Sequence, residues 1–243
     1  QNYQALLRVV FPTGCMARNA RYGTPFGSVL RVQQPGTPRD EAKFEVPGSR
    51  YAAVCDDTEK TGLFVVTEAK YGFSCYEGSL QLSLVRSALV TEAGSDMALR
   101  DVQSDHHYSD IGRHTIRIAV GAYSCDAPRE EQPAALAETL YTPVVEYRGA
   151  AVSCGLRGLR GGESLQPAWA KPCPDGSWIL RLHEVFGQRG TTELLMAPDW
   201  TVEPVDLLER PAEKCVKDGI IGYQPYELIS LKLKRSSQQA VPV

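Results

Sequence analysis

The sequence predicts an all-β fold arranged as sandwiches, and three observations support this prediction. Short segments rich in β-branched and aromatic residues recur along the chain, and turn signals separate them roughly every ten residues. No regular alternation of strands with helices occurs, which argues against a doubly wound sheet or an α/β barrel. The 243 residues suffice for one large domain or two of ordinary size.

Five strands are predicted in the first half of the chain, at residues 6–11, 51–55, 62–67, 79–84 and 115–120. The first has the composition of a buried strand. Residues 79–84 alternate strictly, so Leu80, Leu82 and Leu84 are expected on one face of a half-buried strand. The long polar stretch 91–112 is expected to be a functional loop.

The second half is predicted to begin with residues 126–142 as a linker or one short helix, because two prolines and a charged start precede an alanine- and leucine-rich run. Strands are predicted beyond it at residues 144–147, 150–153, 178–185, 192–196 and 228–233. The glycine-rich stretch 155–162 lacks the strand-to-helix context of a phosphate-binding loop, so it is interpreted as a mobile loop.

Composition and charge argue against several classes of protein. Lys and Arg number 26 against 29 Asp and Glu, a formal net charge of −3, so nucleic acid is not expected as a partner. No apolar run approaches the ~20 residues of a membrane-spanning helix, and no signal peptide is evident, so no membrane partner is expected. The chain lacks an initiator Met, and we expect it to be part of a longer protein.

The seven cysteines are widely spread and include no C-x-x-C pair. Cys55 and Cys75 lie in apolar, strand-like runs, where a free thiol behaves as a small hydrophobic group. The sequence therefore favours a reducing compartment of the cytoplasmic type.

The densest polar cluster is residues 105–114, which contain three of the four histidines. Their spacing offers Asp105, His107, Asp110 and His114 as metal ligands. The alternative is a solvated loop without a metal, and the spacing leaves both open.

No motif assigns a catalytic reaction. The Walker loop, the dinucleotide fingerprint, the nucleophile elbow and H-E-x-x-H are absent from the sequence. Paired carboxylates occur at residues 56–57, at residues 130–131 and at Asp206 with Glu209, and most such pairs are surface turns. The fourth histidine, His183, lies in an alternating segment and is expected to face solvent or a satisfied pocket.

Seven segments, in order, resemble the C-terminal β region of glycoside hydrolase family 38, the class II α-mannosidases. They are residues 22–31 (YGTPFGSVLR), 44–52 (FEVPGSRYA), 68–73 with 78–86 (EAKYGF and GSLQLSLVR), 110–114 (DIGRH), 180–190 (LRLHEVFGQRG), 206–211 (DLLERP) and 224–228 (QPYEL). The resemblance is closest to the cytosolic, vacuolar and bacterial branch. Glu68 stands where the family usually has Asn, and Ile111 where the Golgi branch has Arg.

The resemblance implies a fold and a function. Residues 1–125 are expected to form the second half of a large β-sandwich (a supersandwich of the galactose-mutarotase type), and residues 143–243 a smaller C-terminal β-sandwich. The parent enzyme is expected to hydrolyse terminal α-mannosides with retention, using a zinc-containing catalytic domain that this chain lacks. The chain itself is expected to be inactive, with no catalytic or metal-binding residue and no cofactor of its own.

The resemblance also points to Asp110, Gly112 and His114, whose loop in the family reaches toward the catalytic domain and can line the sugar pocket. Carboxylate and imidazole can exchange hydrogen bonds with sugar hydroxyls, and glycine permits close backbone approach. The alternative role of this loop is structural support of the domain interface.

Expected partners are mannose-containing glycans and the enzyme's own N-terminal catalytic domain, with a homo-oligomer left open. The expected location is the cytoplasm, or the vacuole by a non-secretory route. The alternative function is an independent carbohydrate-binding β-sandwich module. Such modules expose aromatic platforms, whereas Trp169, Trp178 and Trp200 lie in or beside strand patterns and are expected in the core.

Overall fold

The computed structural model describes residues 5–43, 45–88, 108–142, 144, 146, 148–149 and 153–236. Within them it contains strands β1 to β17, helices α1 and α2 and a 3-10 helix η1, so the all-β prediction is confirmed. The chain forms two compact units. Unit 1 comprises Gln1–Gly23, Leu30–Ala127 and Leu136–Tyr141, and unit 2 comprises Thr24–Val29, Pro128–Ala135 and Thr142–Val243.

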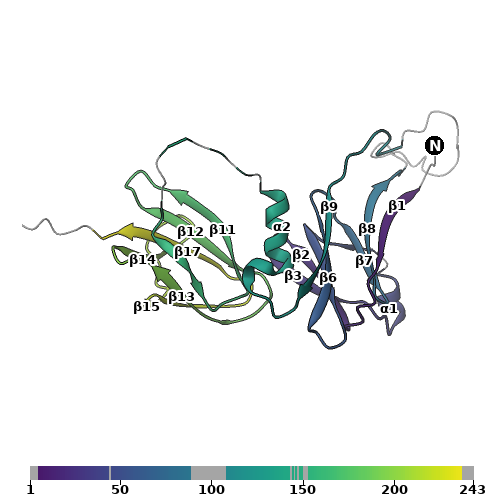
Figure 1. Ribbon diagram of the computed structural model, residues 1–243, viewed down its shortest axis with the longest axis horizontal. Helices are drawn as coiled ribbons and strands as arrows, with labels where there is room; N and C mark the ends of the chain where they lie inside the picture. Colours follow the sequence, from purple (N-terminus) through teal and green to yellow (C-terminus); the bar gives the residue numbers. More distant parts are fainter. Residues whose placement is uncertain are drawn as a thin grey trace, which may run out of the picture. The chain divides into compact units, whose positions relative to one another are not determined.

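Unit 1 is built on two antiparallel sheets (Figure 1). The first has the order β1-β8-β7-β4, with β1 at Leu6–Pro12, β8 at Ser79–Arg86, β7 at Gly72–Tyr76 and β4 at Val46–Pro47. The second has the order β3-β2-β5-β6-β9, with β3 at Gly27–Val32, β2 at Asn19–Thr24, β5 at Tyr51–Cys55, β6 at Thr61–Thr67 and β9 at Ile118–Ser124. The first half of β3 and the last residue of β2 are counted with unit 2. The one-turn helix α1, Pro38–Glu41, begins after Thr37, whose hydroxyl accepts a hydrogen bond from the amide of Asp40.

The core of unit 1 follows the alternation of β8. Leu80 and Leu82 are fully buried. The rings of Tyr22 in β2 and Phe73 in β7 meet edge to face with centroids 6.2 Å apart, which packs the two sheets together. The prediction that the first strand is buried is wrong. Leu7 is 58% exposed, because β1 forms the edge of its sheet.

Unit 2 is a sandwich of two four-stranded sheets. One has the order β10-β13-β16-β15, with β10 at Leu156–Arg160, β13 at Gly190–Met196, β16 at Ile220–Tyr223 and β15 at Val216–Lys217. The other has the order β11-β12-β17-β14, with β11 at Leu165–Pro172, β12 at Trp178–Glu184, β17 at Leu228–Arg235 and β14 at Trp200–Val205. Both sheets contribute to one core, formed by Leu165, Leu180, Leu182, Leu194, Ile221, Tyr223, Ile229, Leu231 and Leu233.

The three tryptophans of unit 2 differ in their burial. Trp178 and Trp200 pack against the core, as predicted. The prediction is wrong for Trp169, which is 61% exposed. A β-bulge between Pro167 and Trp169 shifts the register of β11, so Trp169 stands opposite Arg181. Arg181 alternates with the core residues Leu180 and Leu182, so Trp169 shares its outward face.

The segment 126–142 contains η1, Arg129–Glu131, and α2, Pro133–Tyr141, so the helix alternative is confirmed. Most of the strands predicted at 144–147 and 150–153 lies outside the described residues. Val144, Glu146 and Ser153, which are described, are not in strands.

The mobile-loop interpretation of residues 155–162 is wrong. They contain β10, and the carbonyl groups of Gly161 and Gly162 accept hydrogen bonds from the buried Arg129 guanidinium at 2.9 and 2.8 Å. Gly155 has a φ of +75°, and a Cβ there would overlap the Trp200 indole. These glycines therefore serve packing.

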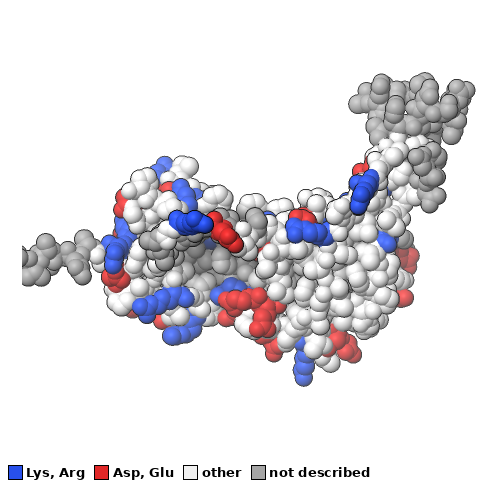
Figure 2. Space-filling view, turned by 45° about the horizontal axis from the view of Figure 1, so that its top comes forward, with Lys and Arg blue, Asp and Glu red and all other residues white. Residues whose placement is uncertain are grey.

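Charges of both signs are interspersed on the surface. On the face shown in Figure 2, neither sign forms a broad continuous area. Several opposite charges are paired, such as Lys232 with Asp175 at 2.8 Å and Arg160 with Glu193 at 2.7 Å. In the part of the chain that the structure describes, no helix has the length and apolar character needed to cross a membrane.

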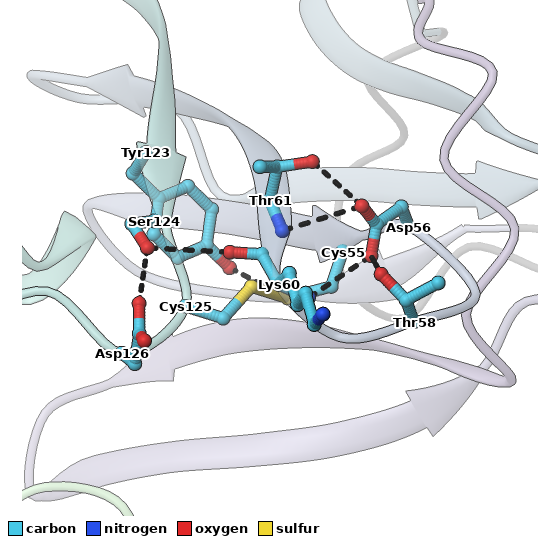
Figure 3. The surroundings of a disulfide bond; sticks show 9 residues. All are labelled: Cys55, Asp56, Thr58, Lys60, Thr61, Tyr123, Ser124, Cys125 and Asp126. Carbon is cyan, nitrogen blue, oxygen red and sulfur yellow. Dashed lines mark hydrogen bonds between the residues drawn. A yellow bond between two sulfur atoms is a disulfide. The ribbon is translucent and has the colours of Figure 1, made fainter.

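A disulfide joins Cys55, at the end of β5, to Cys125, just after β9 (Figure 3). Strand β6 lies between β5 and β9, and its Gly62 stands opposite both Cys55 and Tyr123. A Cβ at Gly62 would lie 2.6 Å from the Tyr123 ring, so glycine leaves room for that ring beside the disulfide. The Tyr123 hydroxyl donates a hydrogen bond to Cys55 Sγ at 3.2 Å.

The disulfide corrects the interpretation of Cys55 as a free thiol. Its partner is 70 positions away in sequence, so the pairing depends on the order of the strands and not on local cysteine spacing. Cys75 is a free, buried thiol, as the sequence suggests, and burial raises its pKa to about 12.

Candidate functional site

An open cleft lies at one end of the sheet β1-β8-β7-β4 in unit 1. Its volume is about 1030 Å³. It is lined by Ala5, Leu6, Glu45, Val46, Pro47, Tyr71, Gly72, Arg86, Ser87 and Ala88. The side chain of Tyr71 is prominent in this lining, because Tyr71 is 60% exposed. The walls of this cleft combine apolar, aromatic and charged side chains.

The end of β8 holds the segment that leads into the predicted site. The amide of Ser109 donates to the carbonyl of Ala88 at 2.8 Å, and its hydroxyl donates to the carbonyl of Arg86 at 2.9 Å. The carboxylate of Asp110 accepts from the amide of Arg86 at 3.4 Å. Arg86 and Ala88 line the cleft, so these bonds hold Ser109 and Asp110 next to lining residues, although neither of the two is itself part of the lining.

Asp110 and His114 are linked through the main chain. His114 Nε2 lies 2.8 Å from the carbonyl oxygen of Asp110, which can only accept, so Nε2 donates this hydrogen bond. Gly112 between them has a φ of +136°, and a Cβ there would meet no atom within 4 Å. Glycine is therefore required by the backbone conformation and not by crowding. All three predicted residues are exposed, and their contact with sugar stays a prediction.

The metal alternative falls largely outside what the structure describes. Asp105 and His107 are not among the described residues, whereas Asp110 and His114 are. Among the residues with described positions, no group of three or more His, Cys, Asp or Glu side chains is placed to hold a metal. A metal site formed by all four of these residues therefore stays a prediction.

One carboxylate in each of two predicted pairs, Asp56 and Asp206, caps a turn. Asp56 accepts hydrogen bonds from the Thr61 hydroxyl and the Lys60 amide in the turn between β5 and β6, and these bonds lower the pKa of Asp56 to about 2. Asp206 accepts from the amides of Leu208 and Arg210, both at 2.9 Å. These carboxylates shape turns and are not arranged as an acid–base pair.

Glu45 is a cleft residue that the sequence reasoning did not single out. Its carboxylate accepts from the Arg8 guanidinium and from the Ser83 hydroxyl, both at 2.8 Å. A Cβ at Gly72 would overlap this carboxylate, so glycine at that position leaves room for it. Two of the seven family-like segments therefore meet here, because Glu45 lies in residues 44–52, whereas Gly72 and Ser83 lie in the segment 68–73 with 78–86. In the sequence, the only signal for Glu45 was its position in the family-like segment 44–52.

Glu68, one of the departures from the family pattern, forms an ion pair with Arg117. Arg117 Nε donates to Glu68 Oε2 at 2.7 Å, and a second guanidinium nitrogen donates to Oε1. The pair lowers the pKa of the Glu68 carboxyl. It joins the end of β6 to the residue before β9.

Three further segments converge in unit 2 on the buried carboxylate of Glu184, which is 0% exposed. It accepts from the amides of Phe186, Gly187 and Tyr226 at 2.9, 2.8 and 2.8 Å. The Tyr226 hydroxyl donates to the carbonyl of Ser28 at 3.1 Å. The convergence of segments 22–31, 180–190 and 224–228 here is structural, because the carboxylate is enclosed and fully hydrogen bonded.

Comparisons with known proteins place both units in one family. Residues 1–93 match the model of the glycosyl hydrolases family 38 C-terminal domain, and residues 164–231 match that of the family 38 C-terminal beta sandwich domain. The chain is 27% identical over 238 residues to human alpha-mannosidase 2C1, covering 93% of this chain and 21% of that protein. It is 30% identical over 115 residues to an alpha-mannosidase of Saccharomyces cerevisiae, covering 46% of this chain and 10% of the relative.

The solved structures share the fold. An alpha-mannosidase from Enterococcus faecalis V583 superimposes with a TM-score of 0.62 at 16% identity, covering 93% of this chain and 25% of that structure. A family 38 protein from Enterococcus faecalis gives a TM-score of 0.63 at 15% identity, covering 93% and 26%. This chain thus spans about a quarter or less of each of these proteins. The two family models and the shared fold lead to one conclusion: the chain belongs to the C-terminal β region of glycosyl hydrolase family 38.

Proposed function

We propose that the chain is the non-catalytic C-terminal β region of an α-mannosidase that hydrolyses terminal α-mannosides with retention. In this proposal residues 1–125 form the second half of a large β-sandwich, and residues 143–243 form the small C-terminal one. The chain supports the catalytic domain and lines part of its sugar cleft, and mannose-containing glycans are the substrates.

The observation that carries this proposal is the cleft in unit 1, where segments of the family resemblance meet at Glu45 and Asp110. Retaining hydrolysis needs a nucleophile and an acid–base carboxyl group roughly 5–5.5 Å apart. Glu45 is occupied by Arg8 and Ser83, and Asp110 accepts from a backbone amide. Their role is therefore to position sugar hydroxyls, and the reacting groups and the expected zinc belong to the catalytic domain.

Two assays test the proposal. The 243-residue chain should not hydrolyse p-nitrophenyl α-mannoside, with or without added zinc, and appreciable turnover would refute the non-catalytic role. In the full-length enzyme, Asp110→Asn and His114→Ala should raise KM severalfold with kcat little changed. Asp57→Asn, a matched change in an exposed turn, should change neither. Unchanged KM in both loop variants would assign the loop a structural role.

The proposed location is the cytoplasm, or the vacuole by a non-secretory route. A homo-oligomer is a further proposal, which measurement of the mass in solution would test. The Cys55–Cys125 disulfide bears on the compartment, because disulfides persist mainly in oxidising surroundings. Trapping free thiols in intact cells before extraction would decide. A reduced pair favours the cytoplasm, and an oxidised pair rules against a fully reducing location.

A carbohydrate-binding module is the second candidate function, and one observation favours it. Trp169 exposes 61% of its surface on the outer face of a sheet in unit 2.

A further inference from the structure

The outer face of the sheet β11-β12-β17-β14 carries an exposed aromatic residue among charged side chains. We call Trp169, Lys171, Arg181 and Glu209 the Trp169 surface. Trp169 stands opposite Arg181 in the β11–β12 pair, and Lys171 follows two positions later on the same face. Directly opposite side chains have Cβ atoms about 4.5–5.5 Å apart, so the side chains of Trp169 and Arg181 leave the sheet side by side.

The polar groups of the Trp169 surface are held in place by contacts with one another. Lys171 Nζ lies 2.5 Å from Glu209 Oε1, and the Arg181 guanidinium lies 3.8 Å from the same oxygen. Arg181 also donates to the carbonyl of Leu207 at 3.1 Å. Glu209 lies in the turn capped by Asp206 and has a φ of +67°, so the turn presents its carboxylate between the two cations.

We propose that the Trp169 surface binds saccharide, with the indole against the C–H face of one pyranose ring. Lys171 and Arg181 would donate to sugar hydroxyl oxygens, and Glu209 would accept from a hydroxyl group. A saccharide suits this surface because its rings carry an apolar face and hydroxyl groups at the rim, matching an aromatic plane with a few fixed polar groups. The choice of mannose-based sugars rests on the proposed function. The proposal that the surface binds a saccharide does not depend on it.

A protein partner suits the surface less well. An interface closing over Trp169 would take the charges of Lys171, Arg181 and Glu209 out of water, and desolvating a charged group is costly even when it is paired. A bound sugar leaves these side chains partly hydrated and adds hydrogen bonds. The bulge before Trp169 agrees with a binding role, because β-bulges often redirect a side chain next to a functional site.

The test is a titration of the 243-residue chain with α-linked mannotriose and, separately, with maltotriose. Binding is measured by calorimetry and by tryptophan fluorescence. We expect saturable binding that weakens about tenfold or more in Trp169→Ala and less in Trp169→Phe. Tyr76→Ala, which removes a half-exposed aromatic side chain in unit 1, should bind like the parent. Melting temperatures of the variants should match the parent, because Trp169 is mostly exposed.

Three outcomes would overturn the proposal: no saturable binding of mannotriose or maltotriose by the parent chain, equal affinity in Trp169→Ala, or equal weakening in Tyr76→Ala. Concentration-dependent self-association that Trp169→Ala abolishes, without sugar binding, would assign the surface to a second copy of the chain. Failure here leaves the proposed mannosidase role intact, because that role is tested by turnover and by the Asp110 and His114 variants. Binding of maltotriose alone would support the surface and reject the mannose choice.

Discussion

Removing the carboxylate of Glu184 tests whether its hydrogen bonds stabilise unit 2. In Glu184→Ala, the amides of Phe186, Gly187 and Tyr226 lose their acceptor. Hydrogen bonds to a charged group contribute about 1.5–3 kcal/mol each, and the partly exposed amides regain some bonding to water. We therefore expect a loss of about 3–5 kcal/mol in the free energy of unfolding of unit 2. Glu184→Gln keeps the shape and one acceptor oxygen, so it should lose less, about 1–3 kcal/mol.

Urea unfolding at pH 7, followed by tryptophan fluorescence, measures this loss, because Trp178 and Trp200 pack against the core of unit 2. Glu213→Ala, at an exposed position of the same unit, is the control and should lie within about 0.5 kcal/mol of the parent. A Glu184→Ala variant within about 1 kcal/mol of the parent would falsify the anchoring role. If that variant does not fold, the Glu184→Gln value carries the test.

The pH dependence gives a second measurement of the same contact. Burial raises the pKa of Glu184, but hydrogen bonds from backbone amides, that of Tyr226 foremost, outweigh burial and the net pKa is lowered. A lowered pKa contributes stability that is present above the unfolded-state pKa of about 4.3 and is lost as pH falls through the folded-state pKa. The stability difference between parent and Glu184→Gln should therefore shrink below about pH 4. A difference that stays constant down to pH 2 contradicts this linkage.

Three further predictions concern single contacts. Reducing the Cys55–Cys125 disulfide, which closes a loop of 70 residues, should lower the stability of unit 1 by up to about 4 kcal/mol in the chain-entropy model. Urea unfolding with and without dithiothreitol measures this, and an equal effect of dithiothreitol on a Cys55→Ser, Cys125→Ser double variant would contradict it. Asp56 should titrate with a midpoint of about 2 by carboxyl NMR, so the stability it contributes is present above about pH 4 and is lost as pH falls toward 2; a midpoint near 4 would show that its turn is not formed. Gly155→Ala should destabilise unit 2 by about 2 kcal/mol or more, because its φ is +75° and its Cβ would overlap the Trp200 indole; melting temperature is the readout, with Gly176→Ala, also at positive φ but in open space, as the smaller matched effect.

Local pattern predicted the core strands well. The alternation in residues 79–84 placed Leu80 and Leu82 in the core, and the continuous apolar run 51–55 coincides with β5, which is buried on both faces. The order of family-like segments also identified the family. Pattern was weaker for edge strands, because β1 has a buried strand's composition while Leu7 is mostly exposed. Composition records preference for extended backbone, and not the number of neighbouring strands.

The candidate site was predicted in part. Asp110 and His114 came from the resemblance, and the structure ties them to the end of β8 at a cleft. Glu45 was missed although it lies in the family-like segment 44–52, because nothing in the local pattern distinguishes it from other residues of that segment. Its place depends on Arg8 and Ser83, which lie on two other strands.

By itself, the sequence determined the all-β class, the main strands and the family, since these depend on local periodicity and on short segments in a fixed order. Tertiary structure alone decided which cysteine pairs with Cys55, which tryptophan faces solvent and which glutamate is buried. The physical reason is that each depends on strand order and register across long sequence separations. A one-residue bulge turned Trp169 outward, and the sheet order brought Cys125 to Cys55 across 70 positions.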